Sequence, residues 1–317
     1  MKTTMNKHAS SLLIAAVLLP NLTRVASATT LSYNTGSLGV AGNGTNTDAV
    51  VLDQPGAIAA GGDMASGYTL NGYTTVPFLA PLNPAVGSPF TIEFWAKPSS
   101  SDTDDAPVSN RISAGNRSGW VFFQRVAGTG WNFRMYNGTG SGLGWDLTGG
   151  TSTLNAWSHV VATWDGSSAK LYVNGVLASS TNSGTGVYNA STTAVLSLAI
   201  IADGLSSGYN GLLDEVAFYG SALSETKIHD HYTAASSPTA GTYSALVIGD
   251  GALEYLQQNP PFASIAKSGL NQIVTFTGIL SQSETLAAGS WSDLSVTSPY
   301  TVTPIPATPK LFFRAHR

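Results

Sequence analysis

The 317-residue sequence has no cysteine, only 10% charged residues and only five glutamates. Without cysteine the protein has no disulfide bonds, so its stability depends on a large core or on a metal bound by other ligands. A charged fraction far below the usual value of about 25% excludes a coiled coil, a charged disordered tail and a nucleic-acid-binding arm. No apolar run reaches the roughly 20 residues that a membrane-spanning helix needs.

The first 28 residues have the three parts of a secretory signal peptide. Lys2 and Lys7 form a positive start, residues 12–19 an apolar segment, and Ala-Ser-Ala at 26–28 a cleavage site that ends at Ala28. Cleavage removes three cations and no acid from a chain of net charge −4, which leaves −7. We therefore expect a secreted, extracellular or cell-surface protein with no nucleic-acid partner and no membrane span. An N-terminal anchor or a buried helix is the alternative for this segment.

Beyond residue 28 the apolar residues recur at every second position. Phe90, Ile92 and Phe94 alternate with Thr91 and Glu93, which predicts a strand with one face toward the core. Three strands joined by Asp-Gly and Asn-Gly turns are predicted at 157–164, 170–173 and 176–178. Further strands are predicted at 120–126, 131–136, 196–201 and 212–219. The predicted fold class is all-β, a two-sheet antiparallel jelly-roll sandwich.

One helix and one linker follow the last of these strands. Ser224 is the expected N-cap, and Leu223, Ile228 and Tyr232 are spaced to pack the helix on the sandwich. Residues 236–241 form a linker of low charge, after which 242–317 is expected to be a small β module with strands near 273–276, 300–303 and 311–314.

Several motifs resemble one known family, in the same order along the chain. They are Phe-Thr-Ile-Glu-Phe-Trp-Ala-Lys-Pro at 90–98, Trp-Ser-His-Val at 157–160, Leu-Tyr-Val-Asn-Gly at 171–175, Gly-Leu-Leu-Asp-Glu-Val-Ala-Phe-Tyr at 211–219 and Ala-Leu-Ser at 222–224. Together they resemble the LamG-like domain of the concanavalin A-like lectin/glucanase superfamily, in its secreted bacterial form. The resemblance implies a jelly roll over residues 29–235. The C-terminal part is similar to modules that end secreted bacterial surface proteins, and residues 243–256 resemble the opening of another LamG-like unit.

The acidic residues do not match the catalytic pattern of that superfamily. Its glucanases carry Glu-x-Asp-x-x-Glu, with two carboxylates about 5 Å apart, and none of the five glutamates lies in such a motif. Asp214 and Glu215 are neighbours in a predicted strand, so we expect them to point to opposite faces. His229 and His231 are expected on a solvated helix face. The resemblance implies a packing and hydrogen-bonding role for His159. The sequence therefore predicts a protein that is not an enzyme.

Calcium is the metal that suits this composition, because an exported acidic chain without cysteine offers oxygen ligands. The resemblance implies that LamG-like domains often carry one Ca²⁺, with Asp214 at the matching position and Asp63 as a second candidate ligand. The alternative for Asp214 is a carboxylate that only accepts backbone hydrogen bonds. For the acidic loop of Asp102, Asp104 and Asp105 a solvated turn is expected, since it lacks the features of a calcium-binding loop.

A sugar site needs aromatic surfaces beside hydrogen-bonding groups. The candidates gather between residues 120 and 145: Trp131, Arg134, Tyr136, Asn137 and Trp145. Alternation places Trp131 with core residues and Arg134 with Tyr136 on the opposite face, while Trp145 follows a glycine-rich loop and is the candidate expected to be most exposed. The alternative is that all these aromatic residues belong to the core.

The predicted function is a secreted, non-catalytic binding module for an extracellular polysaccharide, glycoconjugate or surface protein, assisted by Ca²⁺. Two alternatives stay open: a glycoside hydrolase or lyase with an unrecognised site, and a structural cell-surface adhesion protein.

Overall fold

The structure is a computed structural model of residues 1–317 that describes 31–60, 63–69, 71–101, 104–125, 130–201, 208–239, 241–257, 263–268, 271–276, 279–283, 291–296, 300–302 and 312–316. The expected signal peptide at 1–28 lies outside these residues. So do Asp102 and residue 103 of the acidic loop, and residue 240 of the expected linker. No helix in the described part is long and apolar enough to span a membrane.

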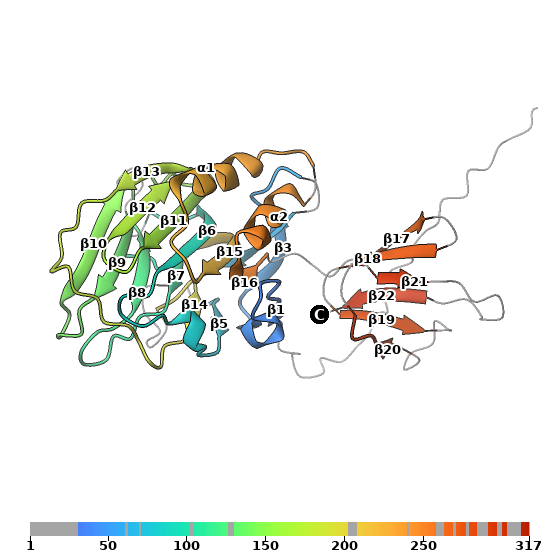
Figure 1. The fold of residues 1–317 in the computed structure, drawn as a ribbon, viewed down its shortest axis with the longest axis horizontal. Coiled ribbons are helices and arrows are strands. Elements are labelled where there is room, and N and C mark those ends of the chain that lie inside the picture. The colour runs from blue at the N-terminus through green and yellow to red at the C-terminus, as the bar shows by residue number, and fades with distance from the viewer. Residues whose placement is uncertain are drawn as a thin grey trace, which may run out of the picture.

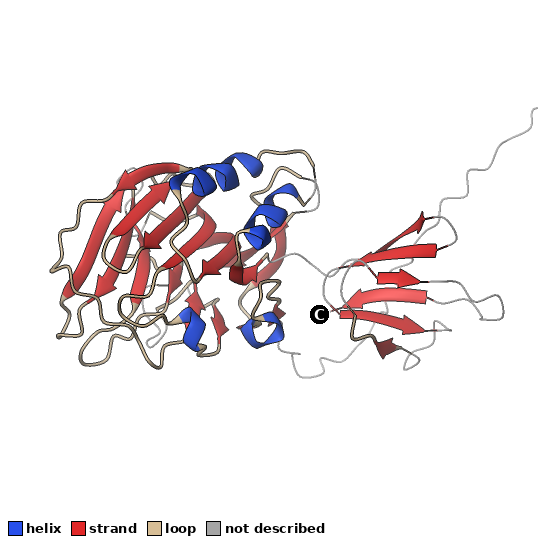
Figure 2. Cartoon of the chain, viewed as in Figure 1, coloured by secondary structure: helices blue, strands red, loops and turns tan. Residues whose placement is uncertain are grey.

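Two large antiparallel sheets form a jelly-roll sandwich (Figures 1 and 2), as the alternating sequence pattern predicts. The first sheet has the order β1 (Leu31–Ser32), β2 (Gly44–Asn46), β5 (Thr74–Val76), β14 (Leu196–Leu198), β7 (Val108–Ser109), β8 (Trp120–Gln124), β9 (Trp131–Tyr136) and β10 (Leu143–Gly149). The second has the order β13 (Val176–Ser179), β12 (Ala169–Val173), β11 (Ser158–Trp164), β6 (Phe90–Pro98), β15 (Gly211–Tyr219), β4 (Met64–Tyr68) and β3 (Val51–Pro55). Two short 3₁₀ turns, η1 (Gly39–Gly42) and η2 (Ala80–Leu82), lie in the connections.

The predicted three-stranded meander is confirmed as β11, β12 and β13. Its second turn has φ of 53° at Asn174 and 73° at Gly175, the left-handed conformations that a type I′ hairpin requires.

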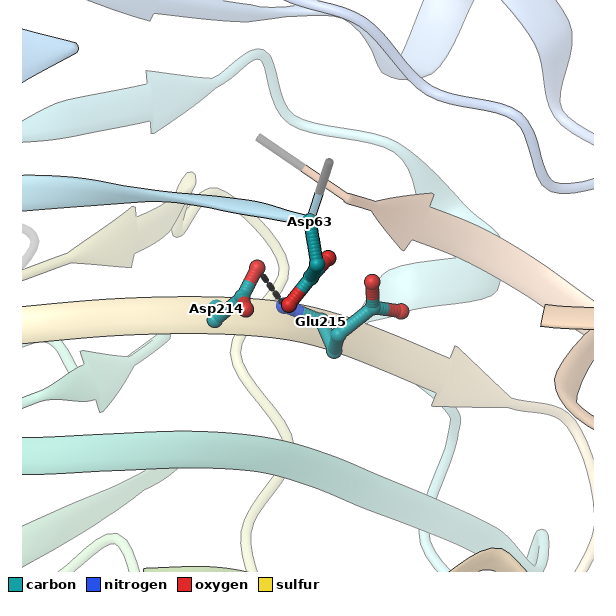
Figure 3. A group of neighbouring side chains, drawn as sticks. All are labelled: Asp63, Asp214 and Glu215. Carbon is teal, nitrogen blue, oxygen red and sulfur yellow. Dashed lines mark hydrogen bonds between the residues drawn. The ribbon is translucent and has the colours of Figure 1, made fainter. Parts of the chain in front are cut away.

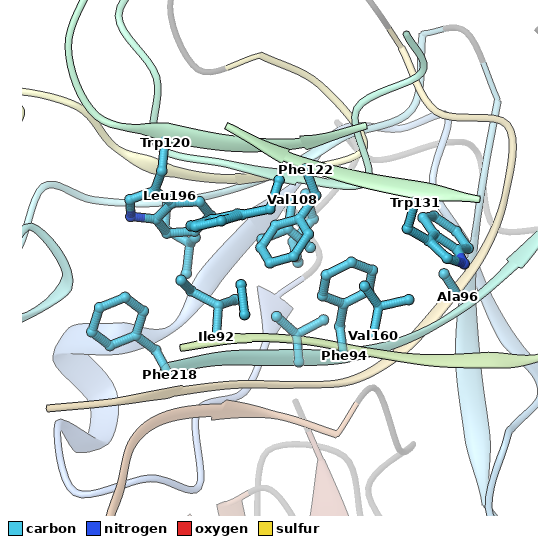
Figure 4. Packing of buried hydrophobic residues seen from close by; sticks show 14 of the residues in the cluster. Ile92, Phe94, Ala96, Val108, Trp120, Phe122, Trp131, Val160, Leu196 and Phe218 are labelled. Carbon is cyan, nitrogen blue, oxygen red and sulfur yellow. The ribbon is translucent and has the colours of Figure 1, made fainter. Parts of the chain in front are cut away.

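The main core lies between the two sheets (Figure 4). Phe90, Ile92 and Phe94 of β6 point into it, as their alternation predicts, and Phe94 meets Phe122 edge to face with ring centroids 4.9 Å apart. Because successive strand residues point to opposite faces, Glu93 and Trp95 lie on the other side of the sheet.

That other side is also buried, because two helices cover it (Figure 2). They are α1 (Glu225–Ala234) and α2 (Thr242–Gly249). Ser224 caps α1 as expected, accepting a hydrogen bond from the Lys227 amide, and Ile228 is fully buried. Tyr243 and Val247 bring α2 into the same apolar cluster.

The jelly roll extends beyond the expected linker at 236–241. Strand β16 (Ala252–Leu256) follows α2 and pairs antiparallel with the second half of β15, from Val216 to Tyr219. The second half of β15 is free to pair with β16 because β4 pairs only with the first half of β15, at 211–213. The segment 242–256, expected in the C-terminal module, therefore completes the second sheet.

The remaining described segments form two three-stranded antiparallel sheets of their own. One has the order β17 (Ala263–Ser268), β18 (Asn271–Phe276), β21 (Tyr300–Val302), and the other β20 (Ser292–Asp293), β19 (Ile279–Ser283), β22 (Phe312–His316). Val274 and Leu280 are the buried centre of this small unit, with Tyr300 and Phe313 packed against them.

Candidate functional site

A β-bulge in β15 brings two neighbouring carboxylates together. Opposite β6, the pairing passes from Asp214 with Trp95 to Ala217 with Glu93, so that β15 holds one extra residue. Glu215 lies in this bulge with a left-handed φ of 52°. The expectation that Asp214 and Glu215 point to opposite faces is therefore wrong, since it assumed an unbroken strand.

Asp63, which precedes β4, completes a group of three carboxylates (Figure 3). One carboxylate oxygen from each of Asp63, Asp214 and Glu215 lies within 4.8 Å of the other two. The structure thus brings together both residues named from the sequence as metal ligands and adds Glu215.

The loop before Asp63 wraps its backbone around these side chains. The Ala57 amide donates to Asp214 Oδ2 at 2.8 Å, and the Ile58 amide donates to Asp63 Oδ2 at 2.7 Å. Gly56 passes so close that a Cβ there would overlap both aspartate carboxylates. Glycine is therefore the residue that lets the loop close over the cluster.

Burial and mutual repulsion make this cluster electrostatically unfavourable by itself. Asp214 is fully buried and Glu215 is 2% exposed. Burial, followed by the charges of the neighbouring carboxylates, raises the pKa of Asp214 and of Glu215 well above the usual range. Burial also raises the pKa of Asp63. A cation would compensate this concentration of negative charge, so the donor set fits one.

The cluster is also tied to strand β16. The Tyr255 hydroxyl donates a hydrogen bond to Glu215 Oε2. A residue from beyond the expected linker therefore contacts a candidate metal ligand, and no motif in the sequence indicates it.

A second buried polar group lies under the helices. Glu93 is fully buried and accepts hydrogen bonds from His231 Nδ1 at 2.9 Å and from the Tyr243 hydroxyl at 2.6 Å. His231 Nε2 lies 3.1 Å from Asp250, which pairs with Lys227 at 2.8 Å. The expected solvated position of His231 is thus wrong, because α2 covers that side of α1, whereas His229 is exposed.

The structure places the expected sugar-binding aromatics inside the protein. Trp131 is fully buried in the main core, and Tyr136 is 1% exposed. Trp145 is 8% exposed and packs edge-on against Trp164, with ring centroids 5.4 Å apart. The expectation that Trp145 is exposed is wrong, since it shares the inward face of β10 with Leu147. These rings have no open face on which a sugar could stack.

The two polar candidates lie nearer the surface. Arg134 is partly exposed and donates from Nε to Asp146 at 3.1 Å. Asn137 is half-buried in the loop after β9, where its Oδ1 accepts from the Thr139 amide at 2.9 Å. Only these two of the five could reach a ligand through their side chains.

Comparison with known families identifies the architecture. The family model Laminin_G_3, described as the concanavalin A-like lectin/glucanases superfamily, matches residues 66–229, just over half of the chain. The chain belongs to this family. The match begins within β4, ends halfway along α1 and includes the bulge at Asp214 and Glu215. It confirms the resemblance of the sequence motifs to the concanavalin A-like lectin/glucanase superfamily.

Solved structures of similar fold come from several kinds of protein. Domain 4 of AbnA, a GH43 extracellular arabinanase of Geobacillus stearothermophilus solved with arabinotriose, is 17% identical with a TM-score of 0.41, covering 64% of this chain and 98% of that one. A heptameric SAP-like pentraxin from Limulus polyphemus is 18% identical with a TM-score of 0.38, covering 50% and 75%. The binding domain of botulinum neurotoxin serotype G is 14% identical with a TM-score of 0.47, covering 84% and 64%. No curated protein matches the sequence, so membership rests on the family match.

Proposed function

We propose that the protein is a secreted, non-catalytic binding module whose jelly roll recognises an extracellular carbohydrate or cell-surface partner and holds Ca²⁺ at Asp63, Asp214 and Glu215. The observation that carries the metal assignment is the meeting of three carboxylate oxygens within 4.8 Å at a largely buried position. Ca²⁺ takes six to eight oxygen ligands in flexible geometry, which carboxylates supply together with backbone carbonyls and water.

The cation would act on the structure of the binding module. Its ligands come from β15 and from the residue that precedes β4, and the loop at 56–58 donates hydrogen bonds to two of them. Bound Ca²⁺ would supply positive charge that holds these segments together. Asp214 and Asp63 themselves orient the loop by accepting hydrogen bonds from the backbone amides of Ala57 and Ile58.

The carboxylates also allow a competing function, a glycoside hydrolase. Paired acids about 5–10 Å apart are what such an enzyme needs, and the bulge brings Asp214 and Glu215 together. Their burial argues against it, because a polysaccharide chain could not reach carboxylates that are 0% and 2% exposed.

A glycan and polysaccharide array probed with the secreted form, in Ca²⁺ and in excess EDTA, tests the proposal. We expect selective binding that EDTA weakens and that Asp214→Asn weakens in the presence of Ca²⁺. The matched control is Asp230→Asn, which removes an exposed acid of α1. Absence of binding under both conditions would contradict the carbohydrate assignment, and release of new reducing ends would support the enzyme instead.

A further inference from the structure

Four of the chain's seven arginines lie over aromatic rings of β8 and β9, on the side of these strands that faces away from the core. Each guanidinium lies over one of two aromatic rings: Arg111 and Arg117 over Tyr136, at 5.0 and 5.8 Å from its centroid, and Arg125 and Arg134 over Phe123, at 5.7 and 5.3 Å. We call these four side chains the arginine face. They come from separate strands and loops, so the fold, not local sequence, brings them together.

Alternation along β9 places Arg134 away from the core, and Arg111, Arg117 and Arg125 lie in the connections on either side of β8. Phe122 and Phe133 point into the sandwich, whereas Phe123 and Arg134 occupy the opposite side of the same strands. Phe123 is 2% exposed. The guanidinium groups cover the aromatic rings, so this face offers charged donors in place of a stacking surface for a neutral sugar.

The face has more hydrogen-bond donors than its own acids use. Arg125 pairs with Asp104, and Arg134 pairs with Asp146. Arg134 donates to Asp146 through Nε, and its two Nη groups have no hydrogen-bond partner among the described residues. Arg117 is half-buried and forms neither an ion pair nor a side-chain hydrogen bond within the described part of the chain.

Unused guanidinium donors fixed on aromatic rings match one class of ligand group. The planar fork of arginine binds carboxylate or sulfate through two parallel hydrogen bonds, and a stacked guanidinium loses less freedom when it does so. The candidate metal centre, with its concentrated negative charge, belongs to the second sheet, whereas the arginine face belongs to the first. An acidic ligand therefore meets positive charge here on a chain that is negative as a whole.

We propose that the arginine face binds the carboxylate or sulfate groups of an anionic polysaccharide, with Arg117 and Arg134 as the main contacts. This inference rests on the proposed function, that the module binds a carbohydrate, and it names the chemical class of that carbohydrate.

The test is affinity electrophoresis and titration calorimetry of the full chain with three polymers. Polygalacturonate offers carboxylates, dextran sulfate offers sulfates, and dextran is the neutral reference. We expect binding to at least one polyanion, weakened by salt, and no binding to dextran. Replacement of Arg117 by Gln should weaken the binding about tenfold, as expected for a charge-assisted hydrogen bond.

Two further variants separate specific binding from charge and from folding. Arg134→Lys keeps the ion pair with Asp146 but loses the fork, so it should also weaken binding while the melting temperature changes little. Lys170→Gln removes an exposed cation from β12 on the other sheet and should leave binding unchanged.

The outcomes distinguish this inference from the proposed function. Absence of polyanion binding at low salt, or equal weakening by Lys170→Gln and Arg117→Gln, would overturn the arginine face as a site. If the array then shows binding of a neutral glycan, the binding function stands without this site. If no glycan of any kind binds, both fail.

Discussion

Glu254 is fully buried on β16, and neither of its carboxylate oxygens has a hydrogen-bond partner among the described residues. Burial raises the pKa of Glu254 to about 9, from an ordinary value of 4.5. Between pH 4.5 and about pH 9 the folded protein therefore keeps a proton on Glu254 that the unfolded chain has released. The stability consequently falls as pH rises from 4.5 toward 9.

Replacement of Glu254 by Gln should increase the free energy of unfolding by about 1–3 kcal/mol near neutral pH, because the amide needs no such proton. Urea unfolding at about pH 7.5 and at about pH 5 checks this, and the gain should nearly vanish at the lower pH. The control Glu225→Gln changes an exposed acid at the start of α1. An equal increase in the free energy of unfolding at both pH values would contradict the raised pKa of Glu254.

His231 and Glu93 form the opposite case, a buried pair that favours its charged form. Burial opposes the ionisation of Glu93, but His231 and, after it, His159 at 3.5 Å hold the pKa of Glu93 well below its usual range. Burial would likewise lower the pKa of His231, yet Glu93 and then Asp250 raise it above 6.5. Glu93 therefore adds to the free energy of unfolding above pH 4.5, and this stabilisation is lost as pH falls through its lowered pKa. His231 adds to the free energy of unfolding below pH 6.5, and this stabilisation is lost as pH rises through its raised pKa.

His231→Gln should therefore lower the free energy of unfolding most between pH 4.5 and pH 6.5. The expected loss is about 3 kcal/mol, because the buried Glu93 carboxylate loses its charged partner. Unfolding by urea across the pH range measures it, with His229→Gln as the control at an exposed position of the same helix. A loss that does not change with pH, or the same loss in both variants, would contradict this account.

Single residues also show what the sequence could and could not predict. Asp63 and Asp214 are named as ligands from the sequence, and the structure brings them together. Strand alternation alone predicts Glu215 on the opposite face, because a β-bulge depends on the register with a distant strand and leaves no local signal. The glycine-rich loop before Trp145 predicts exposure, but the alternation of β10 points the Trp145 side chain into the core with Leu147.

At the scale of elements, strand alternation and turn residues predict most of the sandwich, since each depends on a few neighbouring residues. The sequence could not place α2 and β16. The low-charge segment at 236–241 is typical of a domain linker, yet here it connects two helices that pack on the same sheet. Strand β16 pairs with the part of β15 that β4 leaves unpaired, and this unpaired edge exists only once the sheet has assembled.

Strand β16 leads to a prediction at the same scale. A chain that ends at Gly241 should melt roughly 10 °C or more below one that ends at Gln257, because it lacks the β15–β16 pairing and several buried side chains of α2 and β16. Thermal unfolding followed by circular dichroism compares the two. Equal melting temperatures would show that residues 242–256 are not part of the jelly-roll unit.

The loop over the carboxylates gives a further element-scale prediction. Gly56→Ala should displace the loop, because the added Cβ overlaps the carboxylates of Asp63 and Asp214. We expect at least a tenfold loss of Ca²⁺ affinity, of the order of 1.4 kcal/mol, in calorimetric titration. Gly249→Ala is the control, since a Cβ there meets nothing. Unchanged affinity in Gly56→Ala would place the cation elsewhere.

At the scale of the whole molecule, the protein has no disulfide bond and a negative net charge, yet it concentrates three carboxylates in its interior. A cation bound only by the folded state would offset that cost and raise the stability of the entire jelly roll. The family match and the sandwich are compatible with several functions, so the cluster is the feature on which the proposed binding module depends.

The most direct test is thermal unfolding of residues 29–317 in saturating Ca²⁺ and in excess EDTA, with wild type, Asp214→Asn and the exposed control Asp230→Asn. The account predicts that Ca²⁺ raises the melting temperature of wild type and of Asp230→Asn by roughly 5–10 °C. It predicts little or no rise for Asp214→Asn. Identical melting temperatures of wild type in Ca²⁺ and EDTA, or a rise that persists in Asp214→Asn, would contradict a calcium site at Asp63, Asp214 and Glu215.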